Sequence, residues 1–378
     1  MKILYGVVGE GMGHATRSRV VIEHLLSRGH DVQIVVSGRA HGFLGRCFAG
    51  RERVHLREIQ GLTLAYRHGG LALGASVLEN VEHAPASVLA NAAAYREVAE
   101  ARYRPDVVVS DFESWAYLYA LRHRLPVVSI DNMQVLNRCR HPDLGAEAAL
   151  SFRLARTAVK VKLPFAYHYI VTSFFFPEVA KPRTTLVPPI LRPEVLAAPR
   201  EPGRHVVVYQ TAACNDGLVP LLRTLPFDFV VYGLGGGGRA GNVTLEPFSQ
   251  EGFIERLRTA RAVVAGGGFS LMSEAVHLGV PMLSVPLAGQ FEQELNARWL
   301  AHLGYGMAAR ELDAGVLSAF LARTGDFATA LASYPRQDNT LLYGVVDEVL
   351  ERARRGEPAP DVLAHPSMSR GAACASAA

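Results

Sequence analysis

Residues 1–18 read MKILYGVVGEGMGHATRS, and this stretch indicates how the chain begins to fold. Its apolar run Ile3–Val8 favours a buried β-strand. Three glycines follow the run, and a helical pattern then extends from about Ala15 to Arg28. A strand, a glycine-rich turn and a helix in this order are typical of a parallel α/β sheet.

One position in the glycine-rich turn bears on function. Gly9 and Gly11 match the first two glycines of the dinucleotide-binding loop G-x-G-x-x-G, but His14 stands where the third glycine belongs. This departure argues against a Rossmann oxidoreductase. The unperturbed pKa of a histidine lies near working pH, so His14 suits general-base catalysis.

The composition narrows the class of protein. With 378 residues, 49% of them apolar, the chain is long enough for two domains with their own cores. No apolar run reaches membrane-spanning length and no leader precedes the first strand, so we expect a cytoplasmic protein. The four cysteines lack metal-binding spacing. The net charge of +4 is modest, and we expect no nucleic-acid partner.

The alternation of strands and helices stops at a proline-rich segment near residues 190–203 and then starts again. We therefore expect two α/β domains with a hinge between them. The stretch 61–101 is rich in Ala and Leu and is expected to be mainly helical. The predicted segments are an N-terminal Rossmann-like domain at 1–195, a C-terminal Rossmann-like domain at 203–340, a C-terminal helix at 341–355 that packs back on the first domain, and a disordered tail at 356–378.

The second domain has a glycine-rich turn of its own. The buried strand Ala262–Ala265 leads into Gly266–Gly268, and a helix follows from about Ser270. Glycine amides at the positive end of a helix dipole suit a phosphate group, although a tight strand–helix turn is the alternative interpretation. Glu274 lies one helical turn further, within reach of a sugar diol on the same bound molecule.

A second polar loop follows the next strand, Met282–Val285. There Glu292 and Gln293 place a carboxylate beside a carboxamide, beyond the carboxyl end of the strand. Such a pair can hydrogen-bond the vicinal hydroxyls of a hexose. Open α/β sheets bind their ligands at this edge, so the two loops together predict a site for a sugar and a phosphate.

Residues 260–307 resemble the donor-binding signature of GT-B glycosyltransferases, in which two Rossmann-like domains face each other across a cleft. The resemblance is to UDP-sugar-dependent natural-product and plant enzymes and to the lipid II-forming GlcNAc transferase of peptidoglycan synthesis. Their signature is a glycine pair, a glutamate, Gly-x-Pro and then acidic-Gln-x-x-Asn. The chain matches it with Gly267-Gly268, Glu274, Gly279-Val280-Pro281 and Glu292-Gln293-Glu294-Leu295-Asn296.

The resemblance implies roles for the matched residues. Glu274 would hold the ribose hydroxyls, and Glu292 with Gln293 would hold the donor sugar. Phe248 and Ser249 lie in a segment similar to the loop against which the base packs. Many members carry a phosphate-binding histidine eight residues before the glutamate, where this chain has a glycine. The implied donor-binding residues are Gly11, Gly13, Phe248, Ser249, Gly266, Gly267, Gly268, Ser270, Glu274, Glu292, Gln293 and Asn296.

In such enzymes the N-terminal domain binds the acceptor, and the resemblance implies that His14 is the catalytic base. Asp111 follows the buried strand at 105–110 and corresponds to the aspartate that fixes the tautomer of this histidine. Two alternatives stay open. His14 could contact only the donor phosphates, and Asp111 could only cap the helix that follows it.

The resemblance further implies an inverting, metal-independent hexosyltransferase. It would move a sugar from a nucleoside-diphosphate sugar, with UDP favoured over TDP, to a hydroxyl of a small molecule or a lipid-linked acceptor. No D-x-D triplet for a metal occurs in the chain, and we expect no cofactor. The alternatives are a non-hydrolysing sugar-nucleotide epimerase and a non-catalytic nucleotide-sugar-binding protein.

Three basic residues, Arg153, Arg156 and Lys160, fall on one face of a predicted helix. Such a face can dock on anionic lipid headgroups at the inner face of a membrane, or on a phosphorylated acceptor. A solvated helix face is the alternative interpretation. We expect the nearby run Phe174–Phe176 to pack in the core or at the domain interface.

Overall fold

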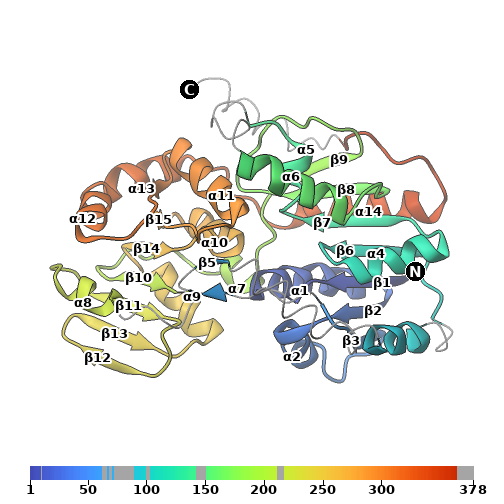
Figure 1. Cartoon of the computed structure of the whole chain (residues 1–378), viewed down its shortest axis with the longest axis horizontal. Helices are drawn as coiled ribbons and strands as arrows, with labels where there is room; N and C mark the ends of the chain where they lie inside the picture. Colours follow the sequence, from blue (N-terminus) through green and yellow to red (C-terminus); the bar gives the residue numbers. More distant parts are fainter. Residues whose placement is uncertain are drawn as a thin grey trace.

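Two seven-stranded sheets, each flanked by helices, make up the computed structural model (Figure 1). The structure describes residues 1–9, 11–61, 66–67, 70–71, 89–98, 103–141, 150–210 and 217–363. Each sheet forms the centre of one domain, and the prediction of two α/β domains is confirmed. No helix in the described ranges is both long enough and apolar enough to cross a membrane.

The N-terminal sheet is parallel throughout and is buried on both faces by helices. In spatial order its strands are β3 (Val54–Glu58), β2 (Asp31–Val36), β1 (Lys2–Val7), β6 (Val107–Asp111), β7 (Val127–Asp131), β8 (His168–Thr172) and β9 (Thr184–Val187). The direction of strand order reverses between β1 and β6, where Val7 pairs with Asp111. The loops after these two strands therefore open together at a switch point, where sheets of this kind bind ligands.

Helices connect the strands of the N-terminal sheet. They are α1 (Met12–Ser27), α2 (Gly38–Cys47), a helix at 89–98, α4 (Ser114–His123), α5 (Val135–Arg138) and α6 (Leu150–Lys162), and the short α7 (Pro193–Leu196) follows β9 in the segment between the domains. The expectation of a mainly helical stretch at 61–101 is wrong at one place, because β4 (Tyr66–Arg67) and β5 (Gly70–Leu71) form a small antiparallel hairpin there. The remainder of that stretch, apart from 89–98 and residue 61, lies outside the described residues.

The C-terminal sheet repeats this design. In spatial order its strands are β12 (Gly238–Ala240), β13 (Val243–Glu246), β11 (Phe229–Tyr232), β10 (Val206–Tyr209), β14 (Ala262–Ala265), β15 (Met282–Ser284) and β16 (Gly306–Ala308). Only the pairing of β12 with β13 is antiparallel among these strands. The helices are α8 (Leu218–Arg223), α9 (Gln250–Arg258), α10 (Phe269–Leu278), α11 (Phe291–His302), α12 (Ala314–Ala322) and α13 (Thr324–Ala332). The switch point lies between β10 and β14, so the glycine turn after β14 opens there.

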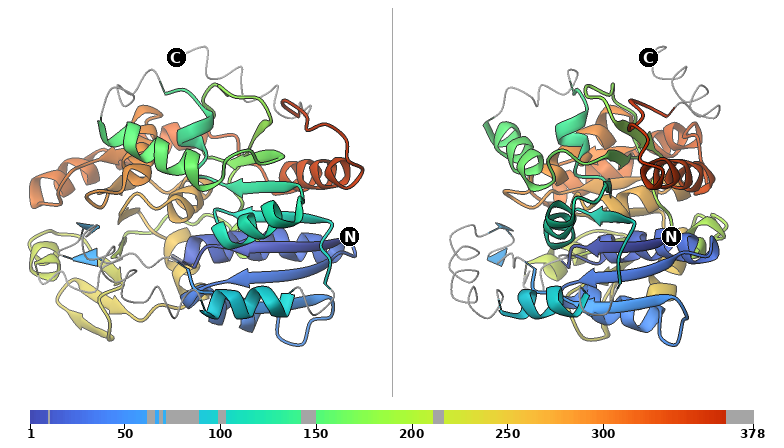
Figure 2. Two further views of the ribbon diagram at one scale, coloured as in Figure 1. Left: turned by 45° about the vertical axis from the view of Figure 1, so that its right-hand side comes forward. Right: turned by 90° about the vertical axis from the view of Figure 1, so that its right-hand side faces the viewer.

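The last described helix, α14 (Thr340–Arg354), returns to the N-terminal domain (Figure 2). Its apolar face is buried in the same cluster as strand β1 and helix α1. The chain then continues along β9, where the amide of Thr184 donates to the carbonyl of Asp361 at 2.9 Å and Leu363 is buried. Residues 357–363, which we expected in a disordered tail, are therefore held by a strand edge, and 364–378 lie outside the described residues.

The two domains meet through aromatic side chains. Phe175 stacks on Trp299 of α11, with ring centroids 4.9 Å apart and planes inclined by 11°. Phe152 of α6 meets Phe291 edge to face at 5.3 Å. These rings belong to one hydrophobic cluster that is continuous across the domain boundary. The expectation that the phenylalanine run packs in the core or at the domain interface is confirmed for Phe174 and Phe175 and wrong for Phe176, which is exposed.

The docking of α14 provides a test of the fold. Leu350 is fully buried against the N-terminal sheet, so Leu350→Ala should lower the free energy of unfolding by about 2–5 kcal/mol through lost contacts and a cavity. Urea denaturation followed by circular dichroism measures this loss. Glu348→Ala, on the exposed face of the same helix, is the control. Equal stability of the two variants would contradict this packing.

Candidate active site

The candidate site lies where the first turns of α1 and α10 meet, one from each domain. A β-carbon added at Gly13 would lie 2.5 Å from Ser270 Oγ and 3.3 Å from Ser270 Cβ, so a glycine at this position lets the two helices lie close together. Gly11, immediately before α1, has a φ of 83°, which glycine adopts without strain. The two glycine-rich turns of the sequence are thus brought together in space.

Neither helix end is capped by a side chain. Gly11 precedes α1 and Gly268 precedes α10, and neither first turn contains an acidic residue. The first amides of a helix have no acceptor within the helix, and the helix dipole is positive at this end. The positive ends of two helices therefore converge on one place between the domains.

His14, in the first turn of α1, pairs with Asp111 at the end of β6. Its Nδ1 lies 2.8 Å from Asp111 Oδ1, while Ser18 donates to Asp111 Oδ2 at 2.8 Å. Burial alone would raise the pKa of Asp111, but the charges of Arg17 and His14 and their hydrogen bonds hold this pKa well below its usual range. A charged aspartate in this position can orient the imidazole.

The ionisation of His14 is set by its surroundings. Burial lowers the pKa of His14, and the charge of Arg17 lowers it further, whereas Asp111 raises it. The net result is a pKa below the usual histidine value, so the ring is neutral near pH 7 and can accept a proton. The alternative role of Asp111 as a helix cap is wrong, because Glu113 caps α4 by accepting from two amides of its first turn.

Sequence reasoning missed Arg17, which lies at the centre of the site. Its Nε donates to Asp111 Oδ2 at 2.8 Å, its Nη2 donates to Asp111 Oδ1, and its Nη1 donates to Asn132 Oδ1. Only 4% of Arg17 is exposed. Arg17 follows His14 by three residues, so both lie on one face of the helix, and this spacing could have indicated that Arg17 belongs to the site. Nothing in the sequence indicated its partner Asn132.

A hydrogen bond joins the two domains at the site. Asn132, directly after β7, donates from Nδ2 to Glu292 Oε1 on α11 at 2.7 Å. Asn296, one turn further along α11, donates to the same oxygen at 3.1 Å and to the carbonyl of Gly267 at 3.0 Å. Burial raises the pKa of Glu292, with both amide donors opposing the shift. The acidic residue of the signature therefore lies directly beside the N-terminal site.

Gln293 holds the two donor-side loops together. Its Oε1 accepts from the amides of Gly267 and Leu287, both at 3.1 Å, and its Nε2 donates to Gln290. A β-carbon at Gly267 would lie 2.3 Å from the carbonyl oxygen of Gln293, and one at Gly266 would lie 3.0 Å from Oε1. The Gln293 carboxamide thus occupies the space next to the position where relatives are expected to carry a histidine.

Glu274 has an unexpected partner. Arg192, from the segment that joins the domains, donates from Nε and Nη2 to the two Glu274 oxygens, each at 2.8 Å. Both side chains are 8% exposed. Burial raises the pKa of Glu274, and the charge of Arg192 opposes this shift. The carboxylate expected to hold a ribose is therefore bonded to the segment that joins the domains.

The remaining predicted donor residues lie around the carboxyl end of β13. Phe248 is 55% exposed, and its ring lies 6.4 Å from that of Tyr209 and 5.7 Å from that of Phe253, centroid to centroid. Ser249 caps α9 by accepting from the amide of Gly252 at 3.0 Å. Phe248 is thus a largely exposed aromatic side chain, while the Ser249 hydroxyl already has a local structural partner.

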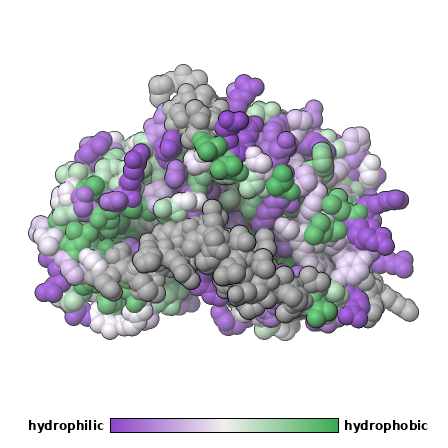
Figure 3. Space-filling view, viewed as in Figure 1, coloured by the Kyte–Doolittle hydropathy of each residue, from purple (hydrophilic) through white to green (hydrophobic). Residues whose placement is uncertain are grey.

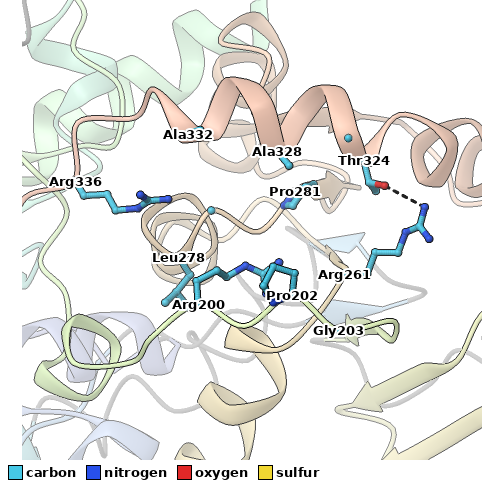
Figure 4. A pocket seen from close by; sticks show the side chains of 12 residues that line it. Arg200, Pro202, Gly203, Arg261, Leu278, Pro281, Thr324, Ala328, Ala332 and Arg336 are labelled. Carbon is cyan, nitrogen blue, oxygen red and sulfur yellow. Dashed lines mark hydrogen bonds between the residues drawn. The ribbon is translucent and has the colours of Figure 1, made fainter.

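A separate cavity of about 280 Å³ lies at the amino ends of the strands of the C-terminal sheet, away from the donor-side loops (Figure 4). It is lined by residues directly before β10, β14 and β15, whereas the donor-side loop follows β14. Its three arginines donate to backbone carbonyls: Arg200 to those of Arg258 and Ala260, Arg261 to that of Leu321, and Arg336 to that of His277. These arginines therefore stabilise the backbone of the surrounding loops and helix ends.

Comparison with known proteins identifies the family. The sequence profile of glycosyl transferase family 1 matches residues 1–325, which is most of the chain. The chain belongs to glycosyl transferase family 1. It is 26% identical over 341 residues to an uncharacterised glycosyltransferase of Methanosarcina mazei, covering 81% of this chain and 85% of that protein. An uncharacterised glycosyltransferase of Methanosarcina acetivorans is also 26% identical, over 335 residues.

Solved structures show the fold of this glycosyltransferase. The glycosyltransferase of kitacinnamycin matches with a TM-score of 0.66 and 16% identity, over 92% of this chain and 98% of that one. The calicheamicin glycosyltransferase CalG4 matches with 0.62 and 20%, over 95% and 99%. MurG of Acinetobacter baumannii matches with 0.58 and 16%, over 93% and 99%. The enzyme therefore has the GT-B fold, as the sequence signature implied.

The buried ion pair of the hinge gives a stability prediction. Arg192→Met leaves the Glu274 carboxylate buried without its partner, and the free energy of unfolding at pH 7 should fall by about 3–5 kcal/mol. Burial raises the folded-state pKa of Glu274, and Arg192 opposes this shift by its charge and hydrogen bonds, so the folded variant should have a higher Glu274 pKa than folded wild type and bind the proton more readily. The loss relative to wild type should therefore shrink as the pH falls toward the ordinary pKa of glutamate.

Denaturant titrations at several pH values measure this effect. The pair of exposed Arg256 with half-buried Glu246 supplies the control, since Arg256→Met should change stability by less than about 1 kcal/mol. A loss for Arg192→Met that is as small as the control, or that does not depend on pH, would contradict a charged pair at this place.

Proposed function

We propose that this glycosyltransferase moves a sugar from a nucleoside-diphosphate sugar to an acceptor hydroxyl, with inversion at the anomeric carbon. The observation that carries the proposal is the His14–Asp111 pair, placed where two uncapped helix N-termini converge. A base and an anion-binding region adjoin each other there. Sugar transfer requires both groups, the base to activate the acceptor and the anion-binding region to hold the diphosphate of the donor.

The two uncapped helix ends would hold the diphosphate. Gly13 and Ser270 are in contact, so amides of α1 and of α10 can reach the same phosphate group. The N-terminal amides of α1 would then serve in place of the histidine that relatives carry before the glutamate. Backbone amides and dipoles stabilise a leaving diphosphate without a cation, which supports the proposal of a metal-independent reaction.

Other residues fit the rest of the donor. Glu292 and Asn296 adjoin the N-terminal site and would contact the sugar hydroxyls. The exposed side chain of Phe248 would stack against the base, and UDP is our proposed nucleotide, with TDP second. Glu274 would hold the ribose only after Arg192 frees part of its carboxylate, whereas Gln293 would act by shaping the loops.

The proposed reaction is a single displacement. With a proton on Nδ1 donated to Asp111, the Nε2 lone pair of His14 accepts the proton of the acceptor hydroxyl. The acceptor oxygen forms a bond to the anomeric carbon while the bond from that carbon to the diphosphate oxygen breaks on the opposite face. The nucleoside diphosphate leaves with the electron pair, near the two helix ends.

We also propose that helix α6 contacts a membrane surface, where a cytoplasmic enzyme would meet a lipid-linked acceptor. Leu150, Leu154 and Val161 form one stripe along this helix and are 62–69% exposed, which is unusual for apolar side chains. Arg153 and Lys160, both exposed, flank the stripe. In the upper middle of the molecule, where Figure 1 labels α6, the surface shows apolar side chains next to hydrophilic ones (Figure 3). A basic helix with an apolar stripe suits an anionic lipid surface.

His14 is the residue on which the transfer proposal depends. His14→Gln should lower transfer by at least about 100-fold, because it removes the base, while binding of UDP stays within a few-fold of wild type. Thermal shifts with UDP, TDP, GDP and NADP measure binding, and release of the nucleoside diphosphate from a panel of donor sugars measures transfer. Near-normal turnover would rule out the base, and stabilisation by NADP alone would rule out the donor class.

The membrane proposal has its own test. The wild-type protein should sediment with vesicles of phosphatidylglycerol and phosphatidylcholine, and less with phosphatidylcholine alone, because the attraction is partly electrostatic. The double variant Leu154→Ser, Val161→Ser should lose most of this binding without a change in stability, since both residues are exposed. Val362→Ser, another exposed apolar residue, is the control. Unchanged binding of the double variant would contradict the proposal.

A further inference from the structure

A group of five basic side chains gathers on the N-terminal domain where α5, α6 and the segment before β9 meet (Figure 1). Residues 138–140 and 178–180 lie side by side there, because the amide of Ala180 donates to the carbonyl of Arg138 at 2.8 Å. Helix α6 packs on α5, which ends at Arg138. The five basic residues are Arg138, Arg156, Lys160, Lys181 and Arg183.

Arg138 is a buried cation whose printed partners in the structure are all neutral. Only 7% of this residue is exposed. Its Nε donates to Thr184 Oγ1 at 2.9 Å, and its Nη2 donates to the carbonyl of Pro182. Its guanidinium lies over the Tyr169 ring, 4.0 Å from the centroid. Buried charges in proteins are normally paired with an opposite charge, and no described carboxylate pairs with this one.

Lys181 is a half-buried cation in the same group. Its ammonium donates to Asn137 Oδ1 at 2.5 Å. Burial lowers the pKa of Lys181, and the charges of three neighbouring cations lower it further. Those cations are Arg156, Arg138 and Lys160, in order of effect. Positive charge therefore accumulates at this place.

The carboxylates of the described residues do not compensate this charge. The ion pair on this part of the surface joins Arg140 to Glu178 at 3.7 Å, and none of the described ion pairs includes a member of the group of five. An anion bound among these cations would offset their repulsion. Phosphate oxygens accept strong hydrogen bonds from ammonium and guanidinium groups, so the group of five suits a phosphate.

The cations adjoin the exposed apolar stripe of α6. Successive residues of a helix are turned by about 100°, so Lys160 lies between Arg156 on one side and the apolar stripe on the other. Phe165, just beyond the helix, is 84% exposed and has a φ of 55°, which is unfavourable for a residue with a β-carbon. A ligand with a phosphate next to an apolar part would match both surfaces, as a membrane lipid does.

We propose that Arg156 and Lys181 bind the headgroup phosphate of an anionic lipid, in a discrete site that Arg138 supports with its charge. Lys160 and Arg183 add positive charge around this site. The inference rests on the proposed membrane contact of α6 and deepens it, because it names the group that is bound and the side chains that bind it. The site shares no residue with the base or with the proposed diphosphate site.

Vesicle binding distinguishes a discrete site from general attraction to a negative surface. One exposed cation near an anionic membrane strengthens binding by about fivefold. Arg153→Gln, on the same helix, is the matched control and should weaken binding to vesicles of phosphatidylglycerol and phosphatidylcholine by about fivefold or less. Arg156→Gln and Lys181→Gln should each weaken it about tenfold or more, because each removes a donor to the bound phosphate. The double variant should lose less than the product of the two single losses, since both residues act on one phosphate.

Inorganic phosphate tests the site without a membrane. With saturating UDP present to fill the proposed donor site, phosphate should raise the melting temperature of the wild type more than sodium chloride of equal ionic strength does. Arg156→Gln should lose this increment. Without phosphate, this variant should melt at or above the wild-type temperature, because it removes one of the repelling charges. A merely structural Arg156 would instead give a lower melting temperature.

The inference and the proposed membrane contact fail in different ways. Equal vesicle binding of Arg153→Gln, Arg156→Gln and Lys181→Gln, with a phosphate increment that all three keep, would overturn the inference. Loss of vesicle binding in Leu154→Ser, Val161→Ser would then still support the membrane contact. A phosphate increment that depends on Arg156, in a wild type that does not bind vesicles, would refute the lipid headgroup as the occupant. If one of the single variants fails to fold, the other decides.

Discussion

A single buried carboxylate, Asp111, is the constraint around which the active site is organised. It lies at the end of β6 with almost no exposed surface, and a buried charge is tolerated only when it is paired and hydrogen-bonded. His14, Arg17 and Ser18 supply these partners, and all three lie within the first two turns of α1. The same interactions thus dock α1 on the sheet, orient the histidine and hold the aspartate charged.

The second constraint is close contact between the domains. Stacked and edge-to-face aromatic pairs close one part of the interface, and at the site itself the backbone at Gly13 lies against Ser270. Aromatic burial of this kind supplies much of the affinity between packed surfaces. The contact between the domains places His14 of the N-terminal domain close to the glycine turn Gly266–Gly268 of the C-terminal domain. The polar bond between Asn132 and Glu292 adds direction to this contact.

Two further elements connect the halves of the molecule. Arg192, in the connecting segment, forms a buried ion pair with Glu274 of the C-terminal domain, and α14 returns the chain to the N-terminal core. The chain therefore crosses between the domains twice. If Glu274 also binds the ribose of the donor, donor binding would act on the connecting segment through Arg192.

The sequence alone determined the parts of this protein that depend on local pattern. Apolar runs that end in glycine turns indicated the strands at Ile3–Val8 and Ala262–Ala265, and the spacing from Gly267 to Asn296 indicated the family, because a donor loop needs those residue types at that spacing. Only the tertiary structure brought in Arg17, Asn132 and Arg192 as partners of Asp111, Glu292 and Glu274. Pairings between residues about 80 to 160 positions apart leave no periodic trace, since they depend on how strand order and domain packing place chain segments in space.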